Sequence, residues 1–207
     1  MTGIILAIGA HPDDIEIGCG GTLKKLIDRG TRVYGVVLTK GQNGQHATDC
    51  HECGASLKSL GVRETHILDF KDGYINFDAG VVSAIEKFVK QYEPEEIYGH
   101  SIHDRHQDHM FTGYATIAAA RKSPKIYLYQ SPSSTSEFSP TSFSVITKNI
   151  EDKINALGFY SSQLERDSIL DLDWVRAEAI YWGHKSLTNN GKKDFVEAFE
   201  MFREVRR

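Results

Sequence analysis

Cysteine, positive charge and long apolar segments are all scarce in this chain of 207 residues. The three cysteines are too few and too clustered for a disulfide framework, which is typical of a reducing compartment. The formal net charge of -4 offers no basic surface for nucleic acid and little attraction to anionic membranes. The apolar run near the N-terminus follows no basic segment and is too short for a signal peptide or a membrane span. We therefore expect a cytoplasmic protein that neither binds nucleic acid nor inserts into a membrane.

Two of the cysteines, Cys50 and Cys53, form a single Cys-x-x-Cys pair. A structural zinc site of this kind needs a second pair, and a thioredoxin-like redox motif needs a preceding strand that is missing here. We interpret these cysteines as small side chains in a helix.

Strand-like and helical patterns alternate through the first 130 residues. Continuous apolar, β-branched segments predict buried strands at 4–8, 33–39, 65–70, 96–99 and 125–129. Apolar residues at helical spacing predict helices at 20–30, 50–60, 81–92 and 106–121. This alternation predicts an α/β, Rossmann-like fold with a mostly parallel sheet and helices on both faces.

The remainder of the chain breaks this alternation. The Ser- and Pro-rich segment 131–144 is typical of a mobile surface loop, and its functional interpretation is a rim or lid over a pocket. Further helices are predicted around 150–157, 173–186 and 192–205. We expect one domain over 1–207, with a core at 1–130 and a C-terminal extension of a rim loop and helices at 131–207.

Ionisable side chains gather directly after two of the predicted strands. The sequence "AHPDD" (10–14) follows the first strand, and "HDRHQDH" (103–109) follows the strand at 96–99. Because ligands bind beyond the carboxyl ends of parallel strands, both clusters are expected to face one crevice. Adjacent carboxylates there are costly unless a positive group holds them, and we expect that group to be a metal ion.

The candidate metal ligands are His11, Asp14 and His109. Two histidines and one carboxylate form the smallest set that binds a divalent metal and leaves room for water. The alternative interpretation is structural, since a single buried histidine is usually a hydrogen-bonded core residue and an aspartate at a helix start is usually a cap. Two dense clusters at paired strand ends favour the metal site.

Three further residues are candidates for catalytic roles. A carboxylate beside the ion that does not ligate it, such as Asp13, is well placed as a general base on water. On the first turn of a helix, His106 shares a face with His109 and can approach the substrate as a general acid or oxyanion partner. Asp108 can orient one of these imidazoles and set its tautomer.

The glycines of "GCGGT" (18–22) raise the alternative of a dinucleotide site. Their spacing does not match G-x-G-x-x-G, and acidic residues occupy the place where a pyrophosphate would lie. A Gly-rich turn and helix start with little side-chain bulk beneath a metal site is the favoured interpretation.

The segment "AHPDDIEIGCGGT" (10–22), together with D-x-H-x-D-H (104–109), resembles the PIG-L / LmbE-like family of zinc-dependent N-acetylglucosaminyl deacetylases. Similarity extends over most of the chain, through the segments "GTRVYGVVLTKG" (30–41), "LGV" (60–62), "SFSVITKNIEDKINAL" (142–157) and "FVEAF" (195–199).

The resemblance implies a role for each matching residue. His11, Asp14 and His109 match the family's metal ligands, and Asp13 matches its general base. His106 matches the histidine that assists the tetrahedral intermediate and the leaving amine. The division of roles between Asp13 and Asp14 rests mainly on this resemblance.

The function implied is hydrolysis of the N-acetyl group of a small N-acetylated amino sugar or its glycoside, with Zn²⁺ as cofactor and Fe²⁺ as the other metal to consider. Alternatives are a metal amidase for another small amide and a non-catalytic metal- or sugar-binding protein. A non-haem iron oxygenase uses the same ligand types, but its usual scaffold is a β jelly roll. The sequence leaves the sugar, the pathway and the oligomeric state open, a homo-oligomer included.

Two positions depart from the family pattern. Asp49 stands where members often have an arginine, and "YSSQ" (160–163) stands where they often have His-x-Ser-Gln. These departures predict different substrate contacts around an intact metal site, and "HATDCHEC" (46–53) is expected near its mouth.

Overall fold

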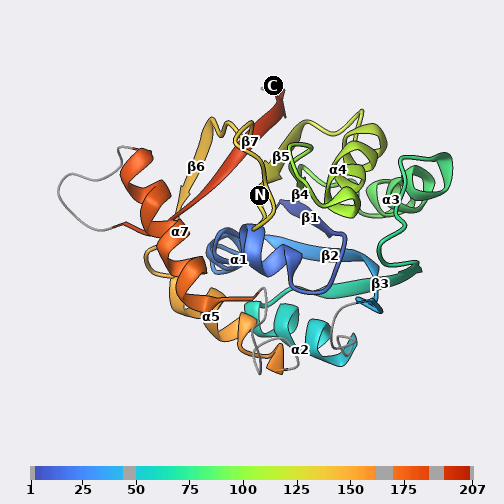
Figure 1. The fold of residues 1–207 in the computed structure, drawn as a ribbon. Helices are drawn as coiled ribbons and strands as arrows, with labels where there is room; N and C mark the ends of the chain where they lie inside the picture. Colours follow the sequence, from blue (N-terminus) through green and yellow to red (C-terminus); the bar gives the residue numbers. More distant parts are fainter. Residues whose placement is uncertain (1–2, 44–49, 162–169, 187–193, 206–207) are drawn as a thin grey trace.

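The computed structural model describes residues 3–43, 50–161, 170–186 and 194–205. Within these ranges, seven strands form one sheet in the order β3-β2-β1-β4-β5-β7-β6 (Figure 1). The strands are β1 (Ile4–Gly9), β2 (Arg32–Thr39), β3 (Glu64–Phe70), β4 (Glu96–His100), β5 (Lys125–Tyr129), β6 (Ser142–Val145) and β7 (Val196–Glu204). The helices are α1 (Asp14–Ile27), α2 (Cys50–Leu60), α3 (Ala79–Tyr92), α4 (Gln107–Ala119), α5 (Ile150–Leu157) and α7 (Leu172–Lys185).

Strands β1 to β5 pair in parallel, and each of the five lies where the sequence predicts a strand. Helices α1, α2, α5 and α7 cover one face of the sheet, and α3 and α4 cover the other (Figure 1). The central strand β1 serves both cores, with Ile5 and Ala7 in one and Leu6 and Ile8 in the other. Successive residues of a strand point to opposite faces, so a strand covered on both sides is apolar throughout. The predicted α/β class with a mostly parallel sheet is confirmed.

Helix α1 begins at Asp14, earlier than the predicted start near Gly20, so "GCGGT" is helical and not a turn. The glycines allow close packing: a Cβ on Gly18 would overlap the ring of Tyr129, and one on Gly21 would overlap Ile146. The small residues therefore bring α1 close to the sheet, which sets the position of its first turn.

The prediction of a helix over 192–205 is wrong, because the described part of this segment forms the strand β7. Its Ala, Glu and Met residues favour helix intrinsically, but tertiary pairing overrides such preferences. β7 pairs antiparallel with β5 on one side and with β6 on the other. The strand β6 likewise begins inside the segment 131–144, which was expected to be a loop throughout.

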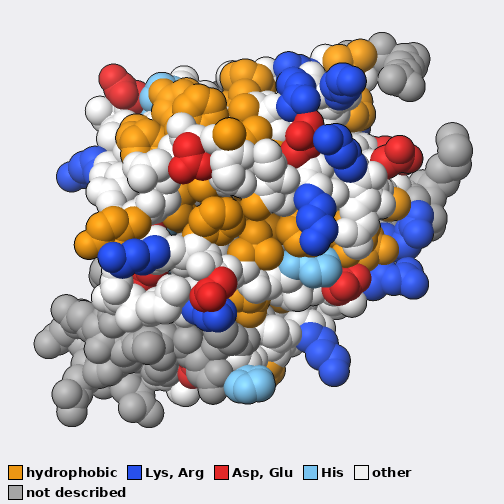
Figure 2. Space-filling model, turned by 90° about the vertical axis from the view of Figure 1, so that its right-hand side faces the viewer, with side chains coloured by type: hydrophobic (Ala, Val, Ile, Leu, Met, Phe, Trp, Pro, Cys, Tyr) orange, Lys and Arg blue, Asp and Glu red, His pale blue; other side chains and the backbone are white. Residues whose placement is uncertain are grey.

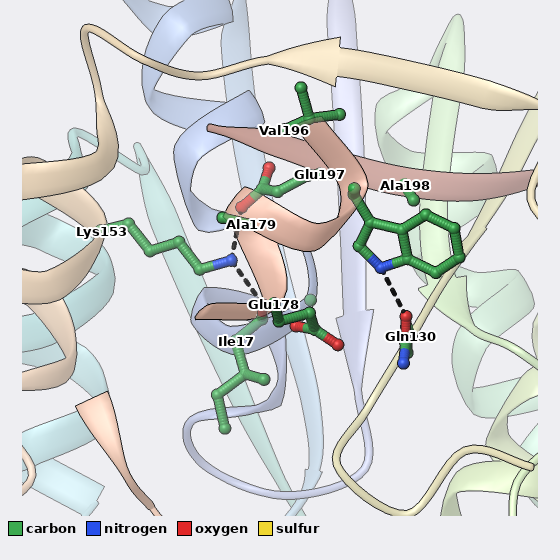
Figure 3. Close-up of a pocket in the computed structure, with 10 residues that line it drawn as sticks. Ile17, Gln130, Lys153, Glu178, Ala179, Val196, Glu197 and Ala198 are labelled. Atoms are coloured by element: carbon green, nitrogen blue, oxygen red, sulfur yellow. Dashed lines mark hydrogen bonds and ion pairs between the residues drawn. The ribbon is translucent and has the colours of Figure 1, made fainter. Parts of the chain in front are cut away.

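A small pocket between α1, α7 and β7 holds a buried ion pair (Figure 3). The ammonium of Lys153 lies 2.7 Å from Oε1 of Glu197 and donates to the carbonyl of Ile17 at 2.7 Å. The carboxylate of Glu197 also accepts the backbone N–H groups of Gly21 and Thr22. This network ties β7 and α5 to α1, and none of the predicted site residues lines the pocket.

The side of the molecule that carries α3 and α4 displays hydrophobic side chains among charged ones (Figure 2). Exposed aromatic rings include Tyr114 of α4 and, in the loop before α3, Tyr74 and Phe77. Among the described residues, no helix is long and apolar enough to cross a bilayer.

We expect Lys153→Met to lower the free energy of unfolding by about 3–5 kcal/mol, since it leaves a buried carboxylate without its cation. Lys153 and Glu197 are only 2% and 4% exposed. Urea unfolding measures the change. Lys90→Met is the matched control, because Lys90 forms an ion pair with Glu86 but is 71% exposed. Loss of this exposed pair should lower the free energy of unfolding by less than about 1 kcal/mol. Equal effects of the two substitutions would contradict this account.

Candidate metal centre

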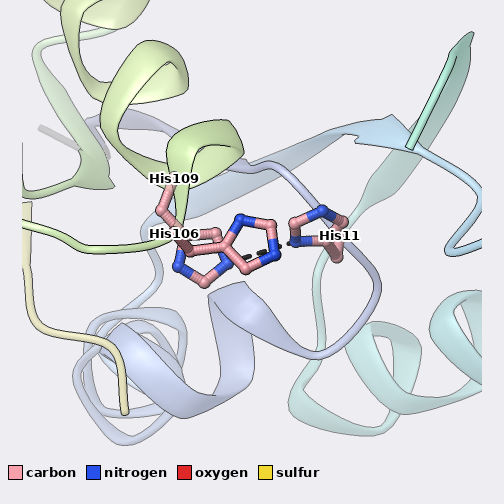
Figure 4. A group of neighbouring side chains, drawn as sticks. All are labelled: His11, His106 and His109. Atoms are coloured by element: carbon pink, nitrogen blue, oxygen red, sulfur yellow. Dashed lines mark hydrogen bonds between the residues drawn. The ribbon is translucent and has the colours of Figure 1, made fainter. Parts of the chain in front are cut away.

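The site lies at the carboxyl ends of β1 and β4, as expected for an open parallel sheet. His11 stands in the short connection between β1 and α1, and His106 and His109 stand at the start of α4. Figure 4 shows these three imidazoles pointing toward one another from the two elements. The two sequence clusters therefore meet in one place.

The three predicted ligands are in mutual contact. Nδ1 of His11 lies 3.1 Å from Nε2 of His109 and 3.5 Å from Oδ2 of Asp14. Oδ1 of Asp14 lies 3.3 Å from Nε2 of His109. Zinc with tetrahedral bonds of about 2.0–2.1 Å keeps its ligand atoms about 3.3 Å apart, which is close to each of these three separations. The two histidines approach different oxygens of the Asp14 carboxylate.

Asp14 is held by a dense set of donors. Its Oδ2 accepts the N–H groups of Ala10 at 3.0 Å and His11 at 2.6 Å, and lies 2.9 Å from Nε2 of His100. Burial lowers the pKa of His100 to about 4, so its neutral ring donates to the carboxylate. Burial alone would raise the pKa of Asp14, but His109 and His100 hold it well below its usual range. Asp14 is thus a fixed anion at this strand end.

His11 is oriented from behind by two carboxylates. Its Nε2 lies 3.2 Å from Oδ2 of Asp108 and 3.2 Å from Oδ1 of Asp72. Asp108 is fully buried and accepts the N–H groups of Gly73 at 2.7 Å and Ile75 at 3.0 Å. An acceptor at Nε2 keeps the hydrogen there and leaves Nδ1 free to bind a metal. The carboxylate of Asp108 therefore contacts His11, and not His106 or His109 as the sequence predicted.

His109 has a similar partner in Asp104. Nδ1 of His109 lies 3.3 Å from Oδ2 of Asp104, which also accepts the hydroxyl of Ser131, while Oδ1 accepts that of Ser133. Although burial lowers the pKa of His109, Asp14 and Asp104 raise it to about 9. The first residues of the segment 131–144 thus hold the carboxylate that contacts His109.

Asp13 and His106, two of the three residues predicted to have catalytic roles, border the ligands. Burial, Asp14 and Glu16 together raise the pKa of Asp13, the direction that a general base needs. His106 is exposed, and its Nδ1 accepts the N–H of Asp108 at 3.3 Å. Its neutral ring therefore carries the hydrogen on Nε2, where it is a donor.

The described residues include more potential ligands than the sequence identified. One nitrogen of each of His11, His106 and His109 lies within 4.8 Å of the other two, and the same holds for ligand atoms of two further groups. Those groups are Asp14, His100 and His109, and His11, Asp72 and Asp108. His106 is therefore a potential metal ligand as well as a neighbour of His11 and His109.

Sequence reasoning missed Asp72, His100 and Asp104. Their positions in the sequence could have identified them. Asp72 and His100 lie at or just after the carboxyl end of a strand, and Asp104 lies within the cluster 103–109. The contacts of Asp72 with His11 and of His100 with Asp14 join distant parts of the chain, so local spacing does not reveal them. Asp104 and His109 are only five positions apart. Cys53 is buried in α2, consistent with its interpretation as a small side chain in a helix. The departure at Asp49 and the last residues of "YSSQ" lie outside the described residues.

Sequence comparison identifies a matching family and several relatives, and the family match includes the clusters 10–14 and 103–109. Residues 6–120 match the PIG-L family, described as GlcNAc-PI de-N-acetylase. The chain is 39% identical over 147 residues to the uncharacterized deacetylase YaiS of Escherichia coli strain K12, covering 67% of this chain and 80% of YaiS. It is 28% identical to the diacetylchitobiose deacetylase of Thermococcus kodakarensis, covering 88% of this chain and 78% of that protein.

Structural comparison shows that a protein with a different activity has a similar fold. GalB, the 4-carboxy-2-hydroxymuconate hydratase of Pseudomonas putida KT2440, superposes with a TM-score of 0.85 at 18% sequence identity. The superposition covers 100% of this chain and 99% of GalB. Since GalB is a hydratase, the fold alone does not determine the reaction.

We expect the protein to bind one zinc ion and His109→Ala to abolish stoichiometric binding, because it removes one of three ligands. Asp104→Asn keeps the ligands but weakens the orientation of His109, so zinc affinity should fall about 10–100-fold. Calorimetric titration of metal-free protein measures both. His184→Ala, at the exposed end of α7, is the control and should leave affinity unchanged. Zinc binding by His109→Ala with unaltered affinity would contradict this assignment.

Proposed function

The chain belongs to the PIG-L family, and on this premise we propose that it is a metal-dependent N-deacetylase acting on a small sugar, glycoside or conjugate that contains N-acetylglucosamine. The observation that carries the proposal is the contact among His11, Asp14 and His109, with Asp13 and His106 beside them. The deacetylase activities named for the relatives agree with it.

We propose His11, Asp14 and His109 as the residues that hold the metal. Zinc bound by this set would lower the pKa of water from about 15.7 toward 7 and polarise the acetamide carbonyl. Imidazole and carboxylate ligands also suit Fe²⁺, which makes it the alternative ion.

Asp13 serves as the general base in this proposal. It accepts a proton from the attacking water as the water oxygen bonds to the carbonyl carbon, and it returns a proton to nitrogen as the C–N bond breaks. One water and one amide thus give one acetate and one free amine. Burial, Asp14 and Glu16 raise the pKa of Asp13, which makes its carboxylate a stronger base.

His106 serves as the oxyanion donor. Since its Nδ1 accepts a backbone N–H, its Nε2–H can donate to the carbonyl oxygen as negative charge develops there. A neutral ring is sufficient for this role. His106 can also donate to the departing amine, and Asp108 supports the reaction through His11.

The proposal treats residues 1–207 as one catalytic unit. Its support is that β7, from the C-terminal part, pairs with β5 inside the sheet, and Ser131 bonds Asp104. A purely binding protein is the alternative from another class. Binding a metal or a sugar requires neither a base nor an oxyanion donor, so Asp13 and His106 favour an enzyme.

A direct test is a screen of N-acetyl sugars, nucleotide sugars and glycosides for release of primary amine and acetate. We expect equimolar release of both by the zinc-loaded protein, loss of release with a chelator, and recovery when zinc is restored. Binding of these sugars without any acetate release would instead identify a binding protein. Hydration of an unsaturated acid, with no action on acetamides, would indicate chemistry like that of GalB.

We expect Asp13→Ala to lower kcat about 10²–10⁴-fold while zinc stoichiometry stays at one, because a general base is removed and a ligand is not. Steady-state kinetics and metal analysis of the same preparation measure the two quantities. Asp171→Ala, which removes the N-cap carboxylate of α7, is the matched control for deleting an aspartate at a helix start. If Asp13→Ala loses its zinc, Asp13 is a ligand and the assigned roles are wrong.

A further inference from the structure

We propose that Tyr160 is a positioning residue for Asp13: its buried hydroxyl holds the backbone of Asp13 in place, and Glu16 orients that hydroxyl. This inference rests on the proposed function, because it concerns the residue assigned there as general base.

The backbone of Asp13 has an unusual conformation. Its φ of 90° lies in the left-handed region, which glycine adopts freely and other residues seldom do. Among the described non-glycine residues, only Glu93 shares this property, and it ends α3, where left-handed residues are common. Asp13 instead stands at the start of α1, and its carboxylate accepts no capping hydrogen bond from that helix. Contacts from outside the helix must therefore maintain its conformation.

Tyr160 provides such a contact. The N–H of Asp13 donates to the phenol oxygen of Tyr160 at 2.9 Å, and the phenol hydroxyl donates to Oε1 of Glu16 at 2.7 Å. The directions of these two hydrogen bonds are determined. A backbone N–H can only donate, so the phenol oxygen accepts it and the hydroxyl hydrogen is available for the carboxylate. Tyr160 is 0% exposed and Glu16 is 1% exposed, so water cannot replace either bond. Burial and the nearby Glu16 raise the pKa of Tyr160, which keeps the phenol protonated.

Tyr160 is itself firmly held. It follows α5, its N–H donates to the carbonyl of Leu157 at 3.1 Å, and its ring belongs to the hydrophobic core between α1 and α5. A side chain from the C-terminal part of the protein thus reaches a residue 147 positions earlier in the chain. The rigid core, and not the loop around Asp13, sets where the hydroxyl lies.

Asp13 and Asp14 are held by different groups, which makes the role of Tyr160 testable. Asp14 is bound by Ala10, His11 and His100, and none of these bonds involves Tyr160. Loss of the hydroxyl should therefore release Asp13 and leave the metal ligand in place. A displacement of about 1 Å at a catalytic group is enough for a large loss of rate.

We expect Tyr160→Phe to lower kcat about tenfold or more, with KM changed less than twofold and one zinc still bound. Tyr98→Phe is the matched control, because it also removes a buried hydroxyl from a carboxylate, that of Glu96, at 3.2 Å. Its kcat should stay within twofold of the parent protein. If Tyr160 only stabilised the fold, then Tyr160→Phe and Tyr98→Phe would lose the same fraction of kcat whenever their Tm values fell equally. That result would overturn the proposal.

Glu16→Gln is the second variant, since an amide oxygen still accepts the phenol hydrogen but more weakly. We expect a several-fold fall in kcat, smaller than that of Tyr160→Phe, with zinc retained. If Tyr160→Phe does not fold, this variant decides, and an unchanged kcat would refute the proposal.

Amide hydrogen exchange at Asp13, followed by NMR of the zinc-loaded protein, tests the contact without any substrate. We expect a protected amide in the parent protein and in Tyr98→Phe, and exchange at least tenfold faster in Tyr160→Phe. If the parent protein hydrolyses no acetamide, the proposed function fails, while the exchange data still show whether Tyr160 holds Asp13. Unchanged exchange in Tyr160→Phe would overturn the positioning role even in an active deacetylase.

Discussion

The site depends on one buried anion, the carboxylate of Asp14. Backbone N–H groups from its own loop and the neutral ring of His100 fix its position, and His11 and His109 meet over it. A carboxylate so buried is costly without positive partners. Here the backbone N–H groups and the imidazoles offset that cost, and a metal ion bound by these residues would offset it further.

Each candidate ligand is in turn held by partners of its own. Asp108 and Asp72 orient His11, Asp104 orients His109, and His100 orients Asp14. Partners of this kind set the tautomer and direction of a metal ligand and so raise its affinity for the ion. They come from two segments at the carboxyl ends of strands: Asp72 follows β3, and His100, Asp104 and Asp108 lie between the end of β4 and the first turn of α4. An open parallel sheet brings such segments together at one edge.

The C-terminal third of the chain adds strands to the sheet and contacts helix α1. β7 adds an antiparallel strand beside β5, and Lys153 and Glu197 anchor that strand to α1, the helix that begins with Asp14. Tyr160 approaches the same helix start from α5. Helix α1 is therefore held by the close packing of Gly18 against Tyr129 of β5 and by contacts from the C-terminal segments.

The sequence alone determined the five parallel strands, the helices between them and the residues that meet at their carboxyl ends, because periodicity and adjacency are local properties. His11, Asp13 and Asp14 are neighbours in the chain, and the family resemblance divided their roles. Only the tertiary structure decided that the last segment is a strand, since its pairing partners β5 and β6 outweigh its helical propensity. It alone revealed the supporting bonds, such as those of His100, which lies 86 positions from Asp14. Such contacts arise when distant segments pack together, so no local pattern of residues encodes them.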